Sequence, residues 1–238
     1  QILSVVNRDM SAFTNYASLL NQISNLSYEL LPITPVIIIQ MLNYLSRQTN
    51  KSKLFDIFEV ILLLVDRTRR ERPTILHNFI RHHLRLSQFC QSLVNAIRLY
   101  IIDDRVNIDL LLPNFSTLFS ILLKAMTVKV ADERENAFSF DFYASIGSLS
   151  ENVVLFIQKA MEKQEITKTK VVNSTFACFL RQLLSFMDKQ FVVTTAARYL
   201  ELIAEIDIIA QRNESFRSQQ TIVEMRLLFF EEFFAGDS

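Results

Sequence analysis

The chain has 238 residues and no net charge at pH 7, because 25 lysines and arginines balance 25 aspartates and glutamates. That balance leaves no global field that would attract nucleic acid or an anionic membrane surface. Only two glycines and four prolines are present. These are too few for the turns of a sandwich, a barrel or a doubly wound sheet, so the composition favours an all-α fold.

Half of the residues are hydrophobic, which is enough for one large core or one continuous repeat array. We therefore expect residues 1–238 to form a single α-helical repeat-like domain. The N-terminus has neither a methionine nor a signal-peptide pattern, which predicts a fragment of a longer chain. Cys90 and Cys178 lie in apolar helical stretches and indicate no disulfide framework, so we expect the cytoplasm or the nucleus. No continuous apolar run reaches the roughly 18 residues of a spanning helix, so no transmembrane segment is expected.

Apolar spacing near the N-terminus predicts a helix over about residues 9–25, with Phe13, Tyr16, Leu20 and Ile23 on one face. A break is expected around residues 27–32. The pair Thr34-Pro35 is typical of a helix start, because threonine caps helices and proline is favoured at the first helical position. A second helix is therefore predicted to run from there to about Arg47.

The next helix, for which Ser52 is the expected cap, contains the most apolar stretch of the chain, LFDIFEVILLLV at residues 54–65. Nine of its ten apolar residues cover about 220° of a helical wheel, far wider than the stripe of a surface helix. The tenth, Leu63, falls among the acids Asp56, Glu59 and Asp66. A helix that is apolar over such an arc is predicted to lie in the middle of a layered helical array.

Pro73 is predicted to restart the chain as a fourth helix, and Ser87 to cap a fifth that continues through Tyr100. Residues 103–107 form the expected turn. Pro113 then precedes a helix to about residue 128.

In the second half, helical spacing persists from residue 138 to residue 160 through Gly147, which predicts one long helix with a weak point at the glycine. The segment KQEITKTK at residues 163–170 is predicted to be a mobile loop. Three further helices are expected at about residues 172–187, 190–211 and 216–234.

The pattern amounts to about ten antiparallel helices of roughly 14–25 residues joined by short loops, stacked as an α-solenoid or as a layered bundle. In helix length, pairing and scarcity of glycine the whole chain resembles armadillo- and HEAT-type helical repeat proteins. The Trp-Leu-Gly-Tyr pattern of tetratricopeptide repeats and the Thr-Pro-Leu-His of ankyrin repeats are absent. The resemblance implies a concave or ridged surface that binds other macromolecules.

Residues that would support catalysis or metal binding are scarce. With glycines only at positions 147 and 236, neither a P-loop nor a dinucleotide fingerprint can be written. The pair Asp103-Asp104 is interpreted as a polar turn, because no second acidic motif accompanies it. His77, His82 and His83 lack the four-residue spacing of a helical metal site. Cys178 sits among Phe176, Phe179 and Leu180, where a thiol is usually a small buried hydrophobe. We expect no catalytic residue, metal or cofactor.

One basic cluster stands out in this neutral chain. It comprises Arg67, Arg69, Arg70, Arg72, Arg81 and Arg85, with a single acid, Glu71, among them. Arginines at a helix C-terminus often only stabilise the helix dipole or pair with neighbouring acids such as Asp66. The other interpretation is a partner-binding patch, because arginine suits bidentate contacts with carboxylates and phosphates.

These observations predict a non-catalytic scaffold segment that binds other proteins, including acidic segments. The first alternative is a helical nucleic-acid-binding module that uses the basic cluster, although no aromatic residues are interleaved there for base stacking. A weaker alternative is an all-helical enzyme or GTPase regulator. The sequence leaves the oligomeric state open.

Overall fold

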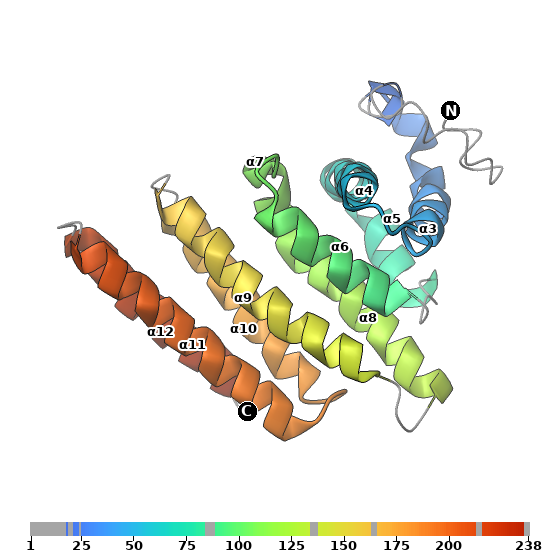
Figure 1. Cartoon of the computed structure of the whole chain (residues 1–238). Coiled ribbons are helices and arrows are strands. Elements are labelled where there is room, and N and C mark those ends of the chain that lie inside the picture. The colour runs from blue at the N-terminus through green and yellow to red at the C-terminus, as the bar shows by residue number, and fades with distance from the viewer. Residues whose placement is uncertain are drawn as a thin grey trace. The chain divides into compact units, whose positions relative to one another are not determined.

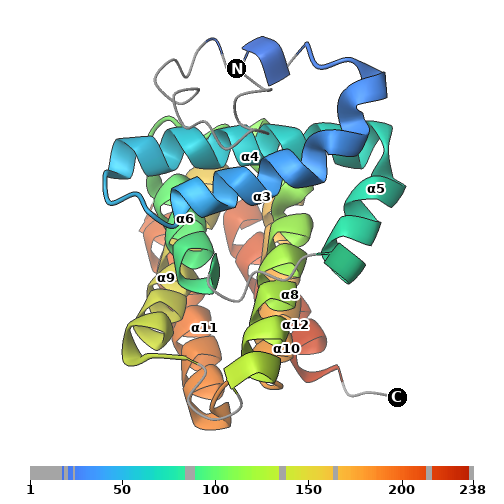
Figure 2. The same ribbon diagram turned by 90° about the vertical axis from the view of Figure 1, so that its right-hand side faces the viewer.

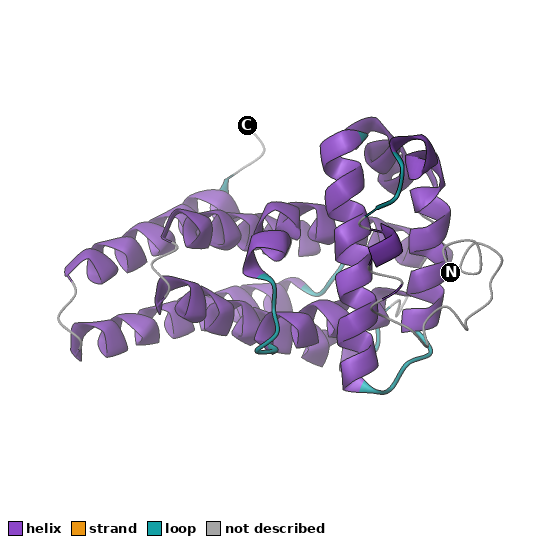
Figure 3. Cartoon of the chain, turned by 90° about the horizontal axis from the view of Figure 1, so that it is seen from above, coloured by secondary structure: helices purple, strands orange, loops and turns teal. Residues whose placement is uncertain are grey.

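A computed structural model describes residues 18, 21–23, 25–83, 89–133, 138–162, 166–212 and 216–235. These residues contain ten α-helices and no β-strand (Figure 3), so the predicted all-α class is confirmed. The chain divides into two compact units, residues 1–134 and 135–238, and each is described by itself. The expectation of a single domain stays a prediction. Most of the helix expected at residues 9–25 lies outside the described residues.

Unit 1 (residues 1–134) combines longer α-helices with short 3₁₀ and π turns (Figure 1). In chain order its elements are η2 (Tyr28–Ile33), α3 (Thr34–Leu45), α4 (Lys51–Glu71), α5 (Pro73–Asn78), η3 (Phe79–His83), α6 (Cys90–Ile102), α7 (Ile108–Leu111), η5 (Leu112–Asn114) and α8 (Phe115–Glu133). The element η3 is a π-helix, whereas η2 and η5 are 3₁₀-helices. The break expected at residues 27–32 is therefore mostly the 3₁₀-helix η2.

Helix α4 is the centre of unit 1, as its sequence predicts. All nine apolar residues of the wide arc are buried, and Leu63 alone among the ten is only half-buried. The helix contacts α3, α5, α6, α7 and η5, and Figure 2 shows α3 and α4 lying side by side. Its cap is Asn50, not Ser52, because the Asn50 side chain accepts a 3.2 Å hydrogen bond from the Lys53 amide.

Thr34 begins α3 with Pro35 in the first helical turn, as predicted, but it does not cap the helix. Its hydroxyl donates instead to the Leu31 carbonyl at 2.6 Å and accepts a 3.1 Å hydrogen bond from the Thr68 hydroxyl of α4. Both threonines are buried. The polar start of α3 is therefore satisfied by one local bond and by one tertiary bond to α4 that its local sequence does not reveal.

Pro73 does restart the chain at α5, within the first helical turn. The fourth predicted helix changes to the wider π geometry at Phe79, and the expected cap Ser87 lies outside the described residues. The helix after Pro113 extends to Glu133, beyond the predicted end.

The described residues of unit 2 (residues 135–238) form four long helices (Figure 1). They are α9 (Phe140–Glu162), α10 (Ile166–Leu183), α11 (Lys189–Arg212) and α12 (Phe216–Phe234). Helix α9 is continuous through Gly147, as predicted, and α12 has the predicted bounds. The four helices pack through α9–α10, α9–α11, α10–α11, α10–α12 and α11–α12 contacts.

The prediction of a loop throughout residues 163–170 is wrong, because α10 begins at Ile166. Thr169 is buried, and its hydroxyl donates to the Ile166 carbonyl at 2.6 Å. Lys170 forms an ion pair with Glu224 of α12. Residues that look like a polar loop in the sequence are held at the start of a helix by these contacts. The helix ends at Leu183, before the predicted end at residue 187.

Two described stretches, Tyr28–Leu45 and Ile108–Ala131, are long and apolar enough to cross a membrane by length and composition. Core helices of soluble proteins pass the same test. Of these windows, 39% and 61% are buried inside the protein. The expectation that no segment spans a membrane stays a prediction.

A candidate partner-binding groove

The predicted basic cluster begins in the last turns of α4, where a buried carboxylate holds two of its arginines. One oxygen of Asp66 accepts a hydrogen bond from Arg69 Nη2 at 3.1 Å, and the other accepts from Arg70 Nε at 2.8 Å. Arginines near a helix C-terminus also interact favourably with the helix dipole. Asp66 is only 7% exposed, although its sequence position is on the acidic side of the wheel.

Asn114 of η5 completes this arrangement. Its Nδ2 donates to Asp66 at 2.9 Å and to the Leu110 carbonyl at 2.8 Å, while its Oδ1 accepts from Arg69 Nε at 2.9 Å. Asn114 is fully buried. Arg69 and Arg70 are thus structural partners of a buried acid, which is the first of the two interpretations of the cluster.

Two other arginines of the cluster are also engaged within unit 1. Arg67 donates to the Glu71 carboxylate at 2.9 Å and to the Ile23 carbonyl at 2.8 Å. The guanidinium of Arg72 lies over the Tyr28 ring, 3.9 Å from its centroid, a distance typical of a cation–π contact. Arg85 lies outside the described residues.

Arg81 is exposed, and it lines a groove with cations from other elements. This groove, which we call the basic groove, has a volume of about 450 Å³. Its lining comes from α4, α5, η3 and α8: Arg69, Pro73, Leu76, His77, Ile80, Arg81, Thr117, Ser120 and Lys124. None of these residues is an aspartate or a glutamate.

The structure thus brings two of the five described residues of the predicted cluster, Arg69 and Arg81, to this groove. It adds Lys124, Thr117 and Ser120 from α8, which sequence reasoning missed. No local pattern marks these three, because they reach the groove only through the packing of α8 against η3. Pro73, Leu76 and Ile80 add an apolar wall, so the groove combines positive charge with an apolar surface.

The pair Asp103-Asp104 lies in a turn, as predicted. Asp103 is held by Arg105 through a 3.0 Å contact, and Arg105 also reaches Asp56 of α4 at 3.3 Å. The hydrogen bond from Arg105 to Asp103 raises the pKa of the guanidinium above its ordinary value. Asp103 and Asp56 therefore belong to a surface ion-pair network of unit 1.

The histidines and cysteines considered in the sequence do not gather into one site, although His77 also lines the basic groove. His77 and His82 are exposed on α5 and η3, while the side chain of His83 lies outside the described residues. Cys90 is buried in α6, and Cys178 is half-buried in α10. Across the described residues, no three His, Cys, Asp or Glu side chains gather as a metal site would require. Catalytic and metal roles are not tested by this arrangement.

Residues 27–233 match the family described as the TPR domain of DOCK6-11. No curated protein and no solved structure gives a significant match. The armadillo and HEAT resemblance is thereby confirmed only at the coarser level of a helical repeat-like domain. The match covers most of both units, even though the tetratricopeptide consensus is absent from the sequence. The chain therefore belongs to the family of the TPR domain of DOCK6-11.

Proposed function

We propose that this chain is a non-catalytic protein-interaction segment of a larger DOCK protein, and that its basic groove holds an acidic segment of a partner. One observation carries the proposal: cations from α4, η3 and α8 line a single groove that has no carboxylate in its lining. An isolated surface arginine needs no such explanation. Arg69 is balanced by buried Asp66, whereas Arg81 and Lys124 have no carboxylate beside them in the lining, and such cations provide a site for a carboxylate-rich ligand.

The groove also suggests the character of that ligand. Leu76, Ile80 and Pro73 supply an apolar wall beside Arg81 and Lys124. Binding sites usually combine such apolar surface with a few polar groups that fix orientation. An acidic peptide with an apolar residue next to its carboxylates fits both features.

The family supports the interaction role, because a helical repeat-like domain offers a large ridged surface rather than a single pocket. We also place the protein in the cytoplasm or nucleus. This placement rests on the two cysteines, which form no disulfide in the described residues.

We propose an armadillo- or HEAT-like subclass of repeat for unit 2, because of the lengths of its helix pairs. The α9–α10 pair spans Phe140 to Leu183, or 44 residues, and the α11–α12 pair spans Lys189 to Phe234, or 46 residues. These lengths match the roughly 40–47 residues of armadillo and HEAT repeats better than the 34 of a tetratricopeptide repeat.

Nucleic acid is the alternative ligand, because phosphates bind the same cations. The groove contains no Phe, Tyr or Trp among its lining residues, so it offers no aromatic platform for unpaired bases. This observation favours an acidic protein segment over RNA. The enzyme and GTPase-regulator alternatives have no residue set in their favour.

The test measures fluorescence anisotropy of a labelled oligoglutamate peptide, with an unlabelled oligouridylate as competitor. Arg81→Glu combined with Lys124→Glu should weaken peptide binding at least tenfold, because like charges facing each other cost several kcal/mol. Binding should also weaken steeply with salt, since exposed charges are screened beyond about 8–10 Å. Arg69 and Arg70 are left unchanged, because they hold buried Asp66.

The matched control is Arg47→Glu with Lys53→Glu, which makes the same charge change at two exposed positions of unit 1 outside the groove. It should bind the peptide like the wild type. Lys124 is half-buried, so glutamine variants at both positions replace the glutamates if the double variant melts early. Equal binding by groove and control variants would refute the site. Tighter binding of the oligouridylate than of the peptide would identify nucleic acid as the ligand of the groove.

A further inference from the structure

Helix α12 carries a row of large apolar side chains that point away from the core of unit 2. Val223, Leu227, Phe230 and Phe234 are between 43% and 65% exposed. Single exposed hydrophobic residues are normal on a protein surface, whereas a contiguous row of them indicates an interaction site.

The spacing of these four residues is four, three and four positions, which is the spacing of a heptad seam. At about 100° per residue, all four project within about 60° of one another around the helix. A second apolar face of α12, centred about 120° away around the helix, packs against α10 and α11. That buried face comprises Ile222, Met225, Phe229 and Phe233. Helix α12 therefore has two apolar faces, and unit 2 covers one of them in the described part of the chain.

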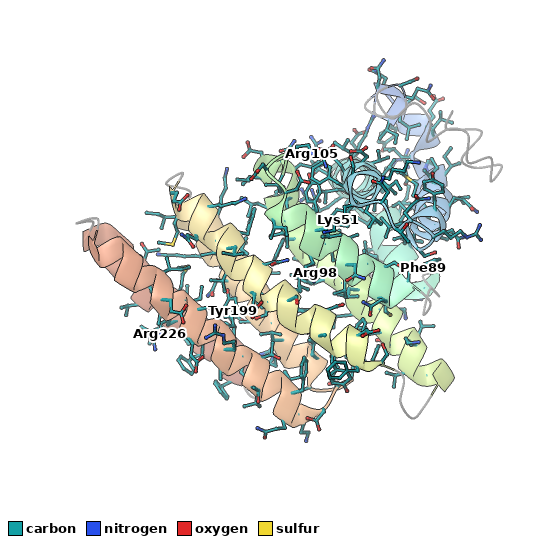
Figure 4. All side chains as sticks on the ribbon, in the orientation of Figure 1. Lys51, Phe89, Arg98, Arg105, Tyr199 and Arg226 are labelled. Carbon is teal, nitrogen blue, oxygen red and sulfur yellow. The ribbon has the colours of Figure 1, made fainter. Side chains whose placement is uncertain are left out.

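A groove of about 410 Å³ borders the seam. Phe230 and Phe234 form one wall, and α11 supplies the other with Val193, Ala197 and Leu200 among its residues. Arg226 lies at the rim on α12 (Figure 4). The groove can accept side chains from a helix that lies along the seam.

Charges beside the seam define which helix fits. With Leu227 at heptad position a and Phe230 at position d, Arg226 occupies position g and Glu231 position e. In a parallel helix pair, each g residue faces the e residue five positions later on the partner. Arg226 and Glu231 are five positions apart and of opposite sign. Both are exposed, and neither forms an ion pair within the described part of the chain.

We propose that α12 pairs in parallel with α12 of a second copy of this chain. The four seam residues pack across a two-fold axis, and Arg226 of each copy meets Glu231 of the other. Such an interface is isologous, because the same patch serves both copies. An antiparallel pair would place position g against g and e against e. It would thus bring arginine toward arginine, so the charges select the parallel orientation.

Two other acids lie beside the seam, and each has a cation of its own. Glu201 of α11 lines the groove and pairs with Arg198 at 3.3 Å. Glu224 forms an ion pair with Lys170 of α10 and accepts a 3.0 Å hydrogen bond from Gln220. Its contacts within unit 2 lower the pKa of the carboxyl group. The Arg226–Glu231 combination is therefore the free complementary pair on this face of α12.

Sedimentation equilibrium of the 238-residue chain tests the proposal. The wild type should dimerise, and Arg226→Glu or Glu231→Arg alone should raise the dimer Kd at least tenfold, because each creates two like-charge contacts. An equimolar mixture of the two single variants should form a mixed dimer of near wild-type affinity. The variant that carries both exchanges should also dimerise.

A second comparison addresses the seam itself. Leu227→Ser should weaken dimerisation, whereas Leu155→Ser, at a 49% exposed position on α9, should leave it unchanged. Helical content by circular dichroism establishes that both variants are folded. A wild-type chain that stays monomeric at its highest soluble concentration would overturn the proposal, since another molecule must then cover the seam. A dimer that is indifferent to these exchanges would overturn it as well.

Discussion

Asn114 lies 48 positions after Asp66, and its amide donates a 2.9 Å hydrogen bond to the Asp66 carboxylate. Both side chains are buried, so the bond ties the C-terminal turns of α4 to η5 where water does not compete. The same carboxylate orients Arg69, a lining residue of the basic groove. The stability of unit 1 and the geometry of the groove therefore share one buried acid.

Asp66→Ala should lower the free energy of unfolding by about 1–3 kcal/mol, because it leaves one N–H of the buried Asn114 amide without an acceptor, while the other still donates to the Leu110 carbonyl. Urea unfolding followed by circular dichroism measures the change. Asp56→Ala is the control, since its ion pair with Arg105 is solvent-exposed and such pairs contribute about 0–1 kcal/mol. Equal midpoints for the two variants would contradict a structural role for Asp66.

Leu62→Asp should destabilise unit 1 by more than about 4 kcal/mol or prevent its folding, because Leu62 is completely buried in α4 and the change buries an unpaired charge. Leu63→Asp, at the adjacent half-buried position, should cost much less. Thermal melting of the two variants provides the comparison. Similar melting temperatures would mean that α4 is not the centre of the unit.

Gly147→Ala should stabilise unit 2 by about 0.5–1 kcal/mol, because alanine has the higher helix propensity. A Cβ at this position of α9 meets no atom within 4 Å, so no steric cost opposes the gain. Ala144→Gly, at an exposed position of the same helix, should produce a loss of similar size. Chemical denaturation should show midpoints on opposite sides of the wild type.

Alkaline pH should destabilise unit 2 through Tyr199. This buried hydroxyl donates a 2.9 Å hydrogen bond to Asn173, and burial raises the pKa of Tyr199 above its ordinary value of 10.0. The neutral phenol is thus favoured in the folded state. Its stabilisation is complete below pH 10 and is lost as the pH rises above 10 toward the higher pKa of the folded state. The loss is on the order of 1 kcal/mol per pH unit.

Tyr199→Phe separates this effect from other alkaline titrations. At neutral pH the variant should be about 1 kcal/mol less stable, because the hydrogen bond to Asn173 is gone. Above pH 10 its melting temperature should decline less steeply than that of the wild type. Parallel declines would show that Tyr199 does not titrate on unfolding.

Strong periodicity made some elements predictable. The apolar arc of α4 and the bounds of α12 follow from spacing that few other structures would satisfy. Caps were less predictable: Asn50 and Ser52 are both good capping residues two positions apart, and only the hydrogen bond to Lys53 decides between them. A helical wheel shows which side of a helix a residue occupies, but not what packs there.

The candidate site depended most on tertiary structure. The sequence placed six arginines near one another, but Asp66, Glu71 and Tyr28 engage most of those that are described. Lys124 enters the basic groove from α8, more than 40 positions after Arg81. The cluster in the sequence therefore predicted more arginines at one surface than the structure places there. The residues that α8 contributes to the groove could be identified only from the fold.

The π-helix η3 has a consequence for how the groove could change. Each turn of a π-helix contains an additional residue compared with an α-helix. Removing one residue from Phe79–His83 would restore α-helical geometry and rotate the flanking side chains by about 100° relative to each other. Ile80 and Arg81 line the groove from within this turn. A single-residue deletion could therefore preserve every cation of the groove in the sequence and still turn Arg81 away from Lys124.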